Sequence, residues 1–170
     1  MYDILLAAVA ALVAGAAIKH VDCIEDSKGG EGNVKWPLAI VAGLCIGYVL
    51  AFSPAAVLFI GVIAAQVLMG KIDRAVHGTA VIIAAAVPLL LGMQYGEMGL
   101  LLPFFALAAL DEVDFREALK PFSDYRLWLK AGALVAGALT GVWDYFVVLL
   151  AFDAAYLAVD RYSNGKMLGM

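Results

Sequence analysis

The sequence predicts an all-α, polytopic helical membrane protein. Of its 170 residues, 65% are hydrophobic and only 15% are charged, and the mean hydropathy is +0.95. A soluble domain of this size cannot bury so much apolar surface, so a lipid bilayer is the expected solvent. The apolar stretches are continuous and do not alternate with polar residues, which favours helices that satisfy their own backbone hydrogen bonds.

The apolar runs give the expected helices in order. They cover residues 4–18, 36–52, 55–70, 79–92 and 98–110, and a final stretch of about double length covers 127–159. A span needs about 20 residues, so we divide the final stretch near Gly141-Val142-Trp143 into 127–140 and 142–159. The result is one bundle domain, residues 1–170, with about seven transmembrane helices. The alternative is six helices, of which the last is bent.

The positions of the basic residues favour seven helices. With seven spans, every Lys and Arg reaches one face: Lys19, Lys28, Lys35, Lys71, Arg74, Arg116, Lys120, Arg126, Lys130, Arg161 and Lys166. The other face receives only Asp3, Glu97, Asp144 and uncharged residues. Cytoplasmic loops of membrane proteins carry an excess of Lys and Arg. We therefore expect a multi-pass protein of the cell (plasma) membrane, with its N-terminus outside and its C-terminus in the cytoplasm.

Small residues recur at a spacing that lets helices approach closely. Gly43 and Gly47, Gly92 and Gly96, and Gly137 and Gly141 are each four residues apart. This spacing favours packing within the chain, and a homo-oligomer formed through these faces is the alternative. Between the helices, residues 111–122 are expected to form a short amphipathic helix at the membrane interface.

The sequence lacks several motifs of soluble enzymes. It has no Gly-rich nucleotide fingerprint, no Walker motif and no Gly-x-Ser-x-Gly. Its two Cys and two His are wrongly spaced for a zinc finger. We expect membrane lipids as partners and no nucleic acid.

Carboxylates gather where apolar runs end on the basic face. Asp22 and Asp26 are four residues apart, which places them on one side of a helix. Mg²⁺ prefers one or two carboxylates together with substrate phosphates, so this pair predicts a Mg²⁺ site. Asp73 and His77 repeat the spacing. The full set of expected metal ligands is Asp22, Asp26, Asp73, His77, Asp111, Asp114 and Asp160. The alternative is a solvated or salt-bridged helix end.

Two further groups complete the expected site. Lys19, Lys71, Arg74 and Arg126 lie beside these carboxylates in the sequence and are expected to bind phosphate. Asp153 lies inside the last apolar run, where an ionisable residue by default indicates function. We therefore assign Asp22, Asp26 and Asp153 as catalytic residues. A buried Asp153 paired with Lys19, Lys71 or Lys130 is the competing interpretation.

The Asp22-x-x-x-Asp26 spacing at a helix end resembles the Asp-rich motif of the UbiA-type intramembrane prenyltransferases. That resemblance implies Mg²⁺ and a prenyl diphosphate held between two such motifs. It covers about nine residues of 170. Ile18 stands where that family has Asn, and Asp153 and Asp160 are seven residues apart instead of four. The sequence therefore supports a physical analogy and assigns no family.

Three hypotheses for the function follow. The first is a Mg²⁺-dependent membrane enzyme that acts on a phosphorylated lipid or isoprenoid at a carboxylate-rich cytoplasmic mouth. The second is a small transporter or channel for a divalent cation or proton, with Asp153, Gln66 and Asp160 along its path. The third is a non-catalytic membrane scaffold subunit, whose carboxylates would point outward to solvent.

Overall fold

The computed structural model describes residues 3–26, 33–94, 96–113 and 125–168, with side chains up to residue 163. This part of the chain is helical and contains no strand. Its elements are α1 (Ile4–Asp26), α2 (Lys35–Phe52), α3 (Ala56–Leu68), α4 (Ala75–Leu91), a 3₁₀ turn η1 (Met98–Leu100), α5 (Leu101–Asp111), α7 (Leu127–Thr140) and α8 (Asp144–Leu168). The all-α prediction is confirmed. The expected interfacial helix falls mostly on residues 114–124, outside the described ranges.

The break between α7 and α8 decides between six and seven helices. Gly141 follows α7 with φ of 76° and ψ of 0°, a left-handed conformation that glycine adopts without strain. Its N–H donates a 2.9 Å hydrogen bond to the Gly137 carbonyl oxygen, which closes the helix in the usual way. The described residues therefore form seven α-helices, and the bent six-helix alternative is wrong.

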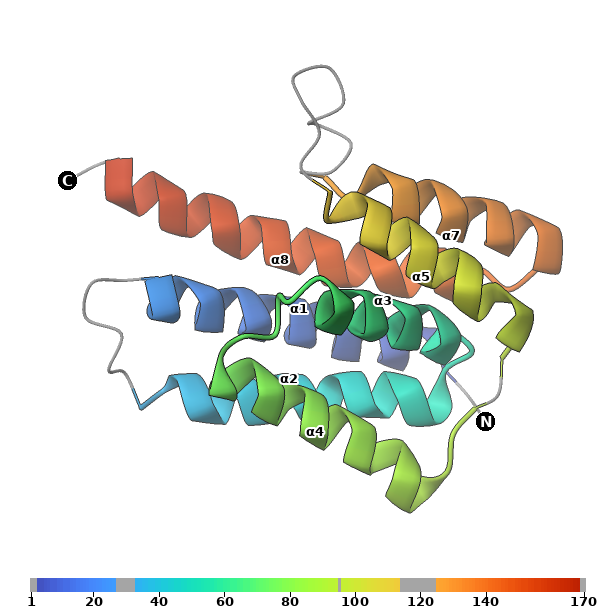
Figure 1. Cartoon of the computed structure of the whole chain (residues 1–170), viewed down its shortest axis with the longest axis horizontal. Coiled ribbons are helices and arrows are strands. Elements are labelled where there is room, and N and C mark those ends of the chain that lie inside the picture. The colour runs from blue at the N-terminus through green and yellow to red at the C-terminus, as the bar shows by residue number, and fades with distance from the viewer. Residues whose placement is uncertain (1–2, 27–32, 95, 114–124, 169–170) are drawn as a thin grey trace.

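Successive helices run in opposite directions, so their ends alternate between the two ends of the bundle (Figure 1). The C-terminal ends of α1, α3, α5 and α8 point the same way as the N-terminal ends of α2, α4 and α7. We call this the charged end, because every described Lys and Arg side chain belongs to the part of its helix or loop that lies toward it: Lys19, Lys35, Lys71, Arg74, Arg126, Lys130 and Arg161. The predicted gathering of basic residues is confirmed for the described residues.

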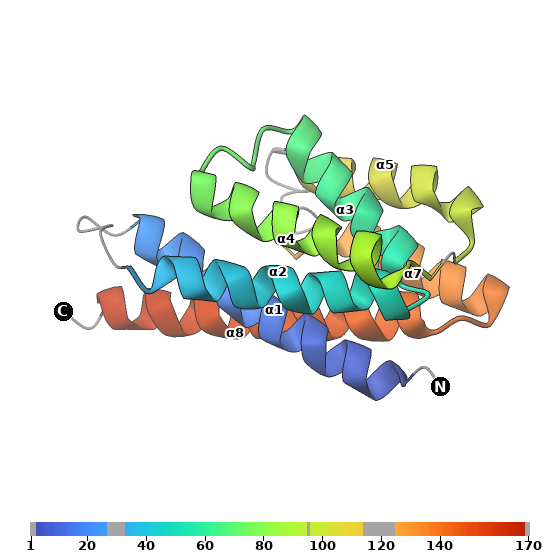
Figure 2. The ribbon, with the colours of Figure 1, turned by 90° about the horizontal axis from the view of Figure 1, so that it is seen from below.

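The helices form an open arc in cross-section. Along the arc, each helix packs against the next in the order α4, α2, α1, α8, α7, α5 and α3. The two helices at the ends of the arc are α3 and α4, which residues 69–74 connect directly. They pack little against each other, although α3 also packs against α2, the neighbour of α4. Figure 2 shows α4 above α2, on the opposite side from α1 and α8. The chain therefore leaves α3 and α4 facing each other across the arc.

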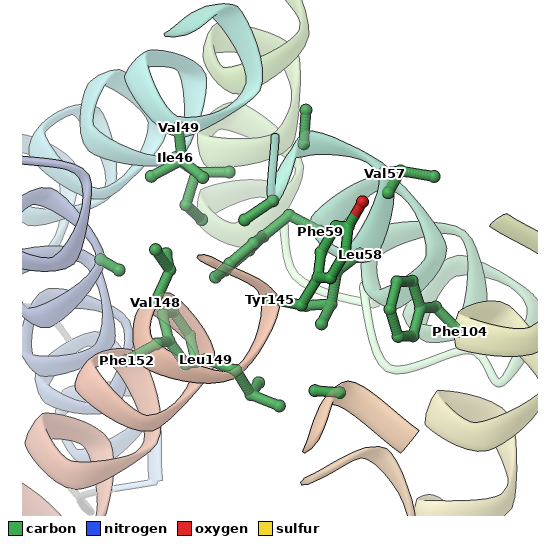
Figure 3. Close-up of a cluster of buried hydrophobic side chains, with 14 of the residues drawn as sticks. Ile46, Val49, Val57, Leu58, Phe59, Phe104, Tyr145, Val148, Leu149 and Phe152 are labelled. Atoms are coloured by element: carbon green, nitrogen blue, oxygen red, sulfur yellow. The ribbon is translucent and has the colours of Figure 1, made fainter. Parts of the chain in front are cut away.

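Close packing of small and aromatic residues holds the arc together. The face that α1 turns inward consists of Ala7, Ala11 and Ala14, all fully buried. Beside it, a Cβ on Gly15 would lie 2.2 Å from the Phe152 carbonyl oxygen, so α1 and α8 are in backbone contact. A larger apolar cluster around the buried Tyr145 joins α2, α3, α5 and α8 (Figure 3).

Two glycines of α2 serve packing within the chain. A Cβ on Gly43 would lie 2.7 Å from the Ala80 carbonyl oxygen, and one on Gly47 would lie 2.6 Å from Val87 Cβ. Both glycines therefore face α4, as the favoured interpretation of their spacing expects. The homo-oligomer stays a prediction.

The described apolar helices fall into two length classes. By length and composition, α1 and α2 are the two described helices able to cross a bilayer. α3, α4 and α7, and η1 together with α5, are apolar but have only 10–17 residues, whereas a full span needs about 20. The coarser prediction, an all-helical chain with apolar helices, is confirmed. The prediction of seven complete spans is not.

Substituting Gly15 by Ala should lower the melting temperature of the detergent-solubilised protein. The added methyl group forces α1 away from α8, and overpacking of this kind costs about 1–3 kcal/mol. Gly78 in α4 is the matched control, because a Cβ there meets nothing within 4 Å. Gly78→Ala should leave the melting temperature unchanged or raise it, since alanine favours helix over glycine. Equal destabilisation by both would contradict the α1–α8 contact.

Candidate functional site

A cavity of about 570 Å³ lies inside the arc and is polar on one side and apolar on the other. Its polar lining, at the charged end, consists of Lys19, Asp22, Glu25, Asp26, Gln66, Lys71, Asp73, Arg74, His77, Glu112, Arg126 and Tyr156. Its apolar lining consists of Ile18, Ile46, Phe59, Val62, Ile63, Ile72, Ala80, Val81, Ala84, Leu149 and Phe152. Ligand pockets are commonly about 300–1,000 Å³, so the cavity is large enough for a small amphiphile.

Asp22 joins three helices at the wall of this cavity. One carboxylate oxygen accepts a 2.8 Å hydrogen bond from the Tyr156 hydroxyl of α8. The other lies 2.9 Å from Nε2 of His77, in the first turn of α4. Asp22 therefore engages both oxygens with protein partners, and its contacts fix the relative positions of α1, α4 and α8.

The contact with Asp22 also changes the chemistry of His77, which precedes the apolar run of α4. The Asp22 carboxylate raises the pKa of the imidazole above its ordinary value of 6.5, with smaller contributions from Asp73 and Glu25, while partial burial opposes the shift. The protonated imidazole is thus stabilised beside three carboxylates. When protonated, His77 adds a positive charge to the cavity wall.

Arg126 stands at the N-cap position of α7 in an unusual conformation. Its φ of 50° and ψ of 46° are left-handed, and its side chain makes no capping hydrogen bond. No other described non-glycine residue has a positive φ. Such a backbone costs about 1–3 kcal/mol and persists only where the surroundings enforce it. Non-glycine outliers of this kind concentrate at functional sites, and Arg126 lines the cavity.

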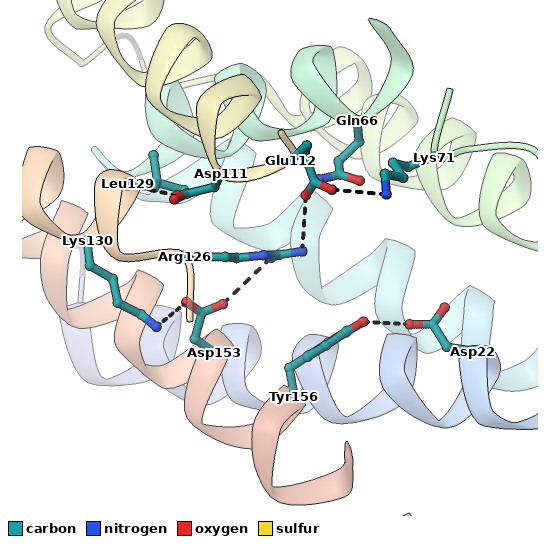
Figure 4. Close-up of polar contacts among 10 residues, drawn as sticks. All are labelled: Asp22, Gln66, Lys71, Asp111, Glu112, Arg126, Leu129, Lys130, Asp153 and Tyr156. Atoms are coloured by element: carbon teal, nitrogen blue, oxygen red, sulfur yellow. Dashed lines mark hydrogen bonds and ion pairs between the residues drawn. The ribbon is translucent and has the colours of Figure 1, made fainter. Parts of the chain in front are cut away.

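Asp111, the last residue of α5, provides the missing cap. Its two carboxylate oxygens accept hydrogen bonds from the N–H groups of Trp128 (3.1 Å) and Leu129 (2.9 Å). These are the second and third residues of α7, the positions that an N-cap side chain normally satisfies. A guanidinium has no acceptor and cannot cap a helix start, so Asp111 supplies the acceptors, and the Arg126 side chain lines the cavity (Figure 4).

The Arg126 guanidinium lies between two carboxylates and above an aromatic ring. Nη2 is 3.7 Å from Glu112 and Nη1 is 3.7 Å from Asp153. The guanidinium carbon is 5.5 Å from the centre of the Tyr156 ring, within the range of a cation–π interaction. Both charge contacts are longer than a hydrogen bond. Charge attraction therefore holds the guanidinium in place. Its N–H groups make no short hydrogen bonds to these two carboxylates.

Glu112 collects several donors at the same place. Its carboxylate accepts a hydrogen bond from the Gln66 amide and lies 3.5 Å from Lys71 Nζ, in addition to the Arg126 contact. The Glu112 side chain is only 13% exposed. The Glu112 carboxylate is therefore a mostly buried negative charge at the cavity wall, and it contacts one amide and two cations. Gln66, which the ion-path hypothesis groups with Asp153, instead donates to Glu112.

Asp153 lies behind Arg126 and does not line the cavity. Its side chain is 5% exposed, and its second oxygen is 3.0 Å from Lys130 Nζ. Two cations thus compensate this buried carboxylate, as the competing interpretation of the sequence expected for Lys130. Its contacts favour a role in positioning Arg126 over one in catalysis.

The expected metal ligands are dispersed. Asp22, Asp26, Asp73 and His77 line the cavity, but Asp111 caps α7 and Asp160 pairs with Lys19 at 2.8 Å. Asp114 lies outside the described residues. Within those residues, no three His, Cys, Asp or Glu side chains are placed to hold a metal ion. A site made of protein ligands alone does not fit this arrangement, and Mg²⁺ stays a prediction.

The four expected phosphate-binding residues all line the cavity. Lys19 contacts Asp160 and the Tyr156 ring, Arg74 reaches Asp73 at 3.7 Å, and Lys71 and Arg126 share Glu112. Sequence reasoning missed Tyr156 and Glu112 as site residues. Tyr156 carried a signal, because it is a polar residue on the α8 face that also bears Asp153 and Asp160.

Comparison with known proteins gives no further guidance. The chain matches no family model, no curated protein and no solved structure. Its function therefore has to be inferred from the chemistry of the cavity and of the surface around the bundle.

Replacing Asp111 with Ala should destabilise the protein by about 1–2 kcal/mol, because two N–H groups at the start of α7 lose their acceptor. Thermal unfolding in detergent measures this loss. Asp26→Ala is the control, since Asp26 is exposed at the end of α1 and should change stability little. If Asp111→Ala is as stable as the Asp26 variant, the capping role is wrong.

The His77–Asp22 pair predicts a dependence of stability on pH. Because the pKa of His77 is raised in the folded state, the ion pair's contribution to folding stability is fully present below the unfolded-state pKa. This contribution is lost as pH rises through the folded-state pKa. The melting temperature should therefore fall as pH rises above about 6.5, and Asp22→Asn should flatten this slope. His20→Gln, at an exposed histidine, should preserve the slope. A wild-type slope in Asp22→Asn would argue against the pair.

Proposed function

We propose that this chain is a polytopic membrane protein that binds a phosphorylated lipid or isoprenoid and acts on it at the charged end of the bundle. The observation that carries the proposal is the cavity lined by cations and carboxylates on one side and by aliphatic and aromatic side chains on the other. Such a lining complements a ligand with a charged head and an apolar chain.

The outer surface of the bundle supports a location in the membrane. Large apolar side chains face outward on several helices, including Leu5 (69% exposed), Ile82 (71%), Leu89 (85%), Leu102 (72%) and Leu139 (82%). A soluble monomer rarely exposes such a large apolar surface. Lipid would cover these side chains, and the shorter helices would be accommodated by local thinning of the bilayer.

The charge distribution supports the orientation. The described basic side chains gather at one end of the bundle, and such an end faces the cytoplasm in membrane proteins. On this proposal the N-terminus lies outside, the cavity opens near the cytoplasmic surface, and the protein crosses the plasma membrane several times.

Arg126 is the strongest candidate for contact with phosphate. A guanidinium offers donors in a planar fork that matches phosphate oxygens. Here the fork is positioned by Glu112, Asp153 and the Tyr156 ring, and Lys71 lies on the far side of Glu112. Lys19 and Arg74 would add positive charge around the head group.

Asp22 and His77 give the same cavity a carboxylate–imidazole pair. In this pair Asp22 orients the imidazole and stabilises its proton, the arrangement in which histidine serves as an acid or base. If Mg²⁺ takes part, Asp22 and Asp26 are the residues that would meet it together with ligand phosphates. Binding in the presence and absence of Mg²⁺ tests that prediction.

The two other hypotheses receive less support from the described contacts. A cation or proton path through Asp153 would have to pass a carboxylate already neutralised by Lys130 and Arg126. A scaffold with outward carboxylates fits poorly with Asp22, Asp111 and Glu112, which contact other helices inside the protein. Both hypotheses stay predictions.

Purified protein in nonionic detergent should bind farnesyl diphosphate and should not bind farnesol, which lacks the phosphate. Arg126→Ala should weaken the binding of farnesyl diphosphate by about ten- to a hundredfold, the cost of losing charged hydrogen bonds. Arg161→Ala is the matched control, because Arg161 is exposed at the same end and does not line the cavity. Isothermal calorimetry or scintillation proximity gives the affinities.

Equal binding of farnesyl diphosphate by the Arg126 and Arg161 variants would reject Arg126 as the phosphate contact. Absence of binding by the wild-type protein, with and without Mg²⁺, would reject the proposed function itself. Conversion of the bound diphosphate, followed by phosphate release, would then separate an enzyme from a carrier.

A further inference from the structure

The open side of the arc lies between α3 and α4. These helices are consecutive in the chain, but α3 packs mainly on α5 and to a smaller extent on α2, whereas α4 packs on α2. Both line the cavity: Val62 and Ile63 from α3 face it on one side, and Ala80 and Val81 from α4 on the other. The cavity therefore separates two helices that an ordinary helical hairpin would bring into contact.

The α3 rim of this open side is apolar, and its edge at the charged end is basic. Val67 and Leu68 at the end of α3 are 57% and 68% exposed, whereas Ile82, next to Val81, points outward from α4 and does not line the cavity. Residues 69–74 cross from α3 to α4 at the charged end and bring Lys71 and Arg74 to the cavity. A chain that passes between the helices would thus meet apolar side chains along its length and cations at its end.

Contacts among charged and polar groups lie at the charged end of the cavity. Gln66 of α3 bonds to Glu112 beyond α5, and Lys71 and Arg126 approach the same carboxylate. These contacts connect α3, the 69–74 loop and the start of α7 at the charged end, next to the apolar part of the cavity. An apolar chain that entered from this end would have to cross the charged groups, at a cost in desolvation.

We propose that the apolar chain of the ligand enters the cavity laterally, from the bilayer, through the gap between α3 and α4, and that it stays bound in this gap. The ligand class is a single-chain lipid phosphate or diphosphate, with its head beneath the 69–74 loop and the distal part of its chain extending through the gap into lipid. A volume of about 570 Å³ suits a head group with part of one chain better than two long chains. This inference rests on the proposed function and specifies its ligand.

The length of the ligand's apolar chain tests whether the cavity opens between α3 and α4. A closed cavity accepts chains only up to its own length, whereas a lateral gap accepts any longer chain because the excess lies in the bilayer. In lipid nanodiscs, undecaprenyl diphosphate should therefore compete with farnesyl diphosphate at least as well as unlabelled farnesyl diphosphate does. Failure of the longer chain to compete would show a closed cavity and overturn the inference, while farnesyl diphosphate binding would keep the proposed function intact.

Two neighbouring substitutions locate the gap. Val81→Trp fills the wall between α3 and α4, and Ile82→Trp adds the same side chain on the outward face as its control. Val81→Trp should weaken farnesyl diphosphate binding by at least about tenfold and leave binding of inorganic diphosphate within about twofold of wild type. Ile82→Trp should change neither.

The outcomes of these experiments distinguish the inferred position of the ligand's apolar chain from the proposed function. Unchanged farnesyl diphosphate binding by Val81→Trp would place the chain elsewhere and overturn the inference. If Val81→Trp fails to fold, the smaller change Ala84→Leu, at another cavity-lining position of α4, should show the same selective loss, and its absence would overturn the inference in the same way. If the wild-type protein binds neither farnesyl diphosphate nor undecaprenyl diphosphate, the proposed function is rejected instead.

Discussion

The two hydrogen bonds from α7 to the Asp111 carboxylate determine how the charged end is built. Helix α7 begins at a residue whose own side chain cannot cap it, and Asp111 supplies the acceptors from the end of α5. These bonds join the two helices directly after Arg126, whose backbone is left-handed. It also sets the Arg126 guanidinium between Glu112, Asp153 and Tyr156. A cap between helices thus has a direct consequence for the candidate binding site.

The remaining charges follow a common physical rule. Partly buried carboxylates are costly unless partners compensate them, and here the partners come from different helices. Asp22 is satisfied by Tyr156 of α8 and His77 of α4, and Glu112 by Gln66, Lys71 and Arg126. These interactions connect helices whose apolar faces alone would leave their rotation and sliding poorly defined. The same interactions surround the cavity with groups that a phosphate would recognise.

The shape of the arc explains why a cavity exists at all. Small residues let α1 approach α8 and α2 approach α4 until their backbones touch, whereas α3 packs mainly on α5 and to a smaller extent on α2. No comparable contact brings α3 to α4, so space remains between them. Dense packing on one side and an unfilled gap on the other are consequences of where glycine and alanine occur along the helices. The membrane-facing opening that we propose uses that gap.

The sequence by itself determined the helical class, the break at Gly141 and the gathering of charges at one end, because these depend on local hydropathy, on one glycine conformation and on the alternation of helix direction. It also identified Asp22, His77, Lys71 and Arg126 as residues of one polar region. Only the tertiary structure decided their partners. Asp22 and Asp26 share a helix face, yet Asp22 bonds to Tyr156 and His77, which are distant in sequence. Asp111 was expected to bind metal, but it caps α7. The cap depends on the C-terminal end of α5 lying beside the N-terminal end of α7, which no local pattern records.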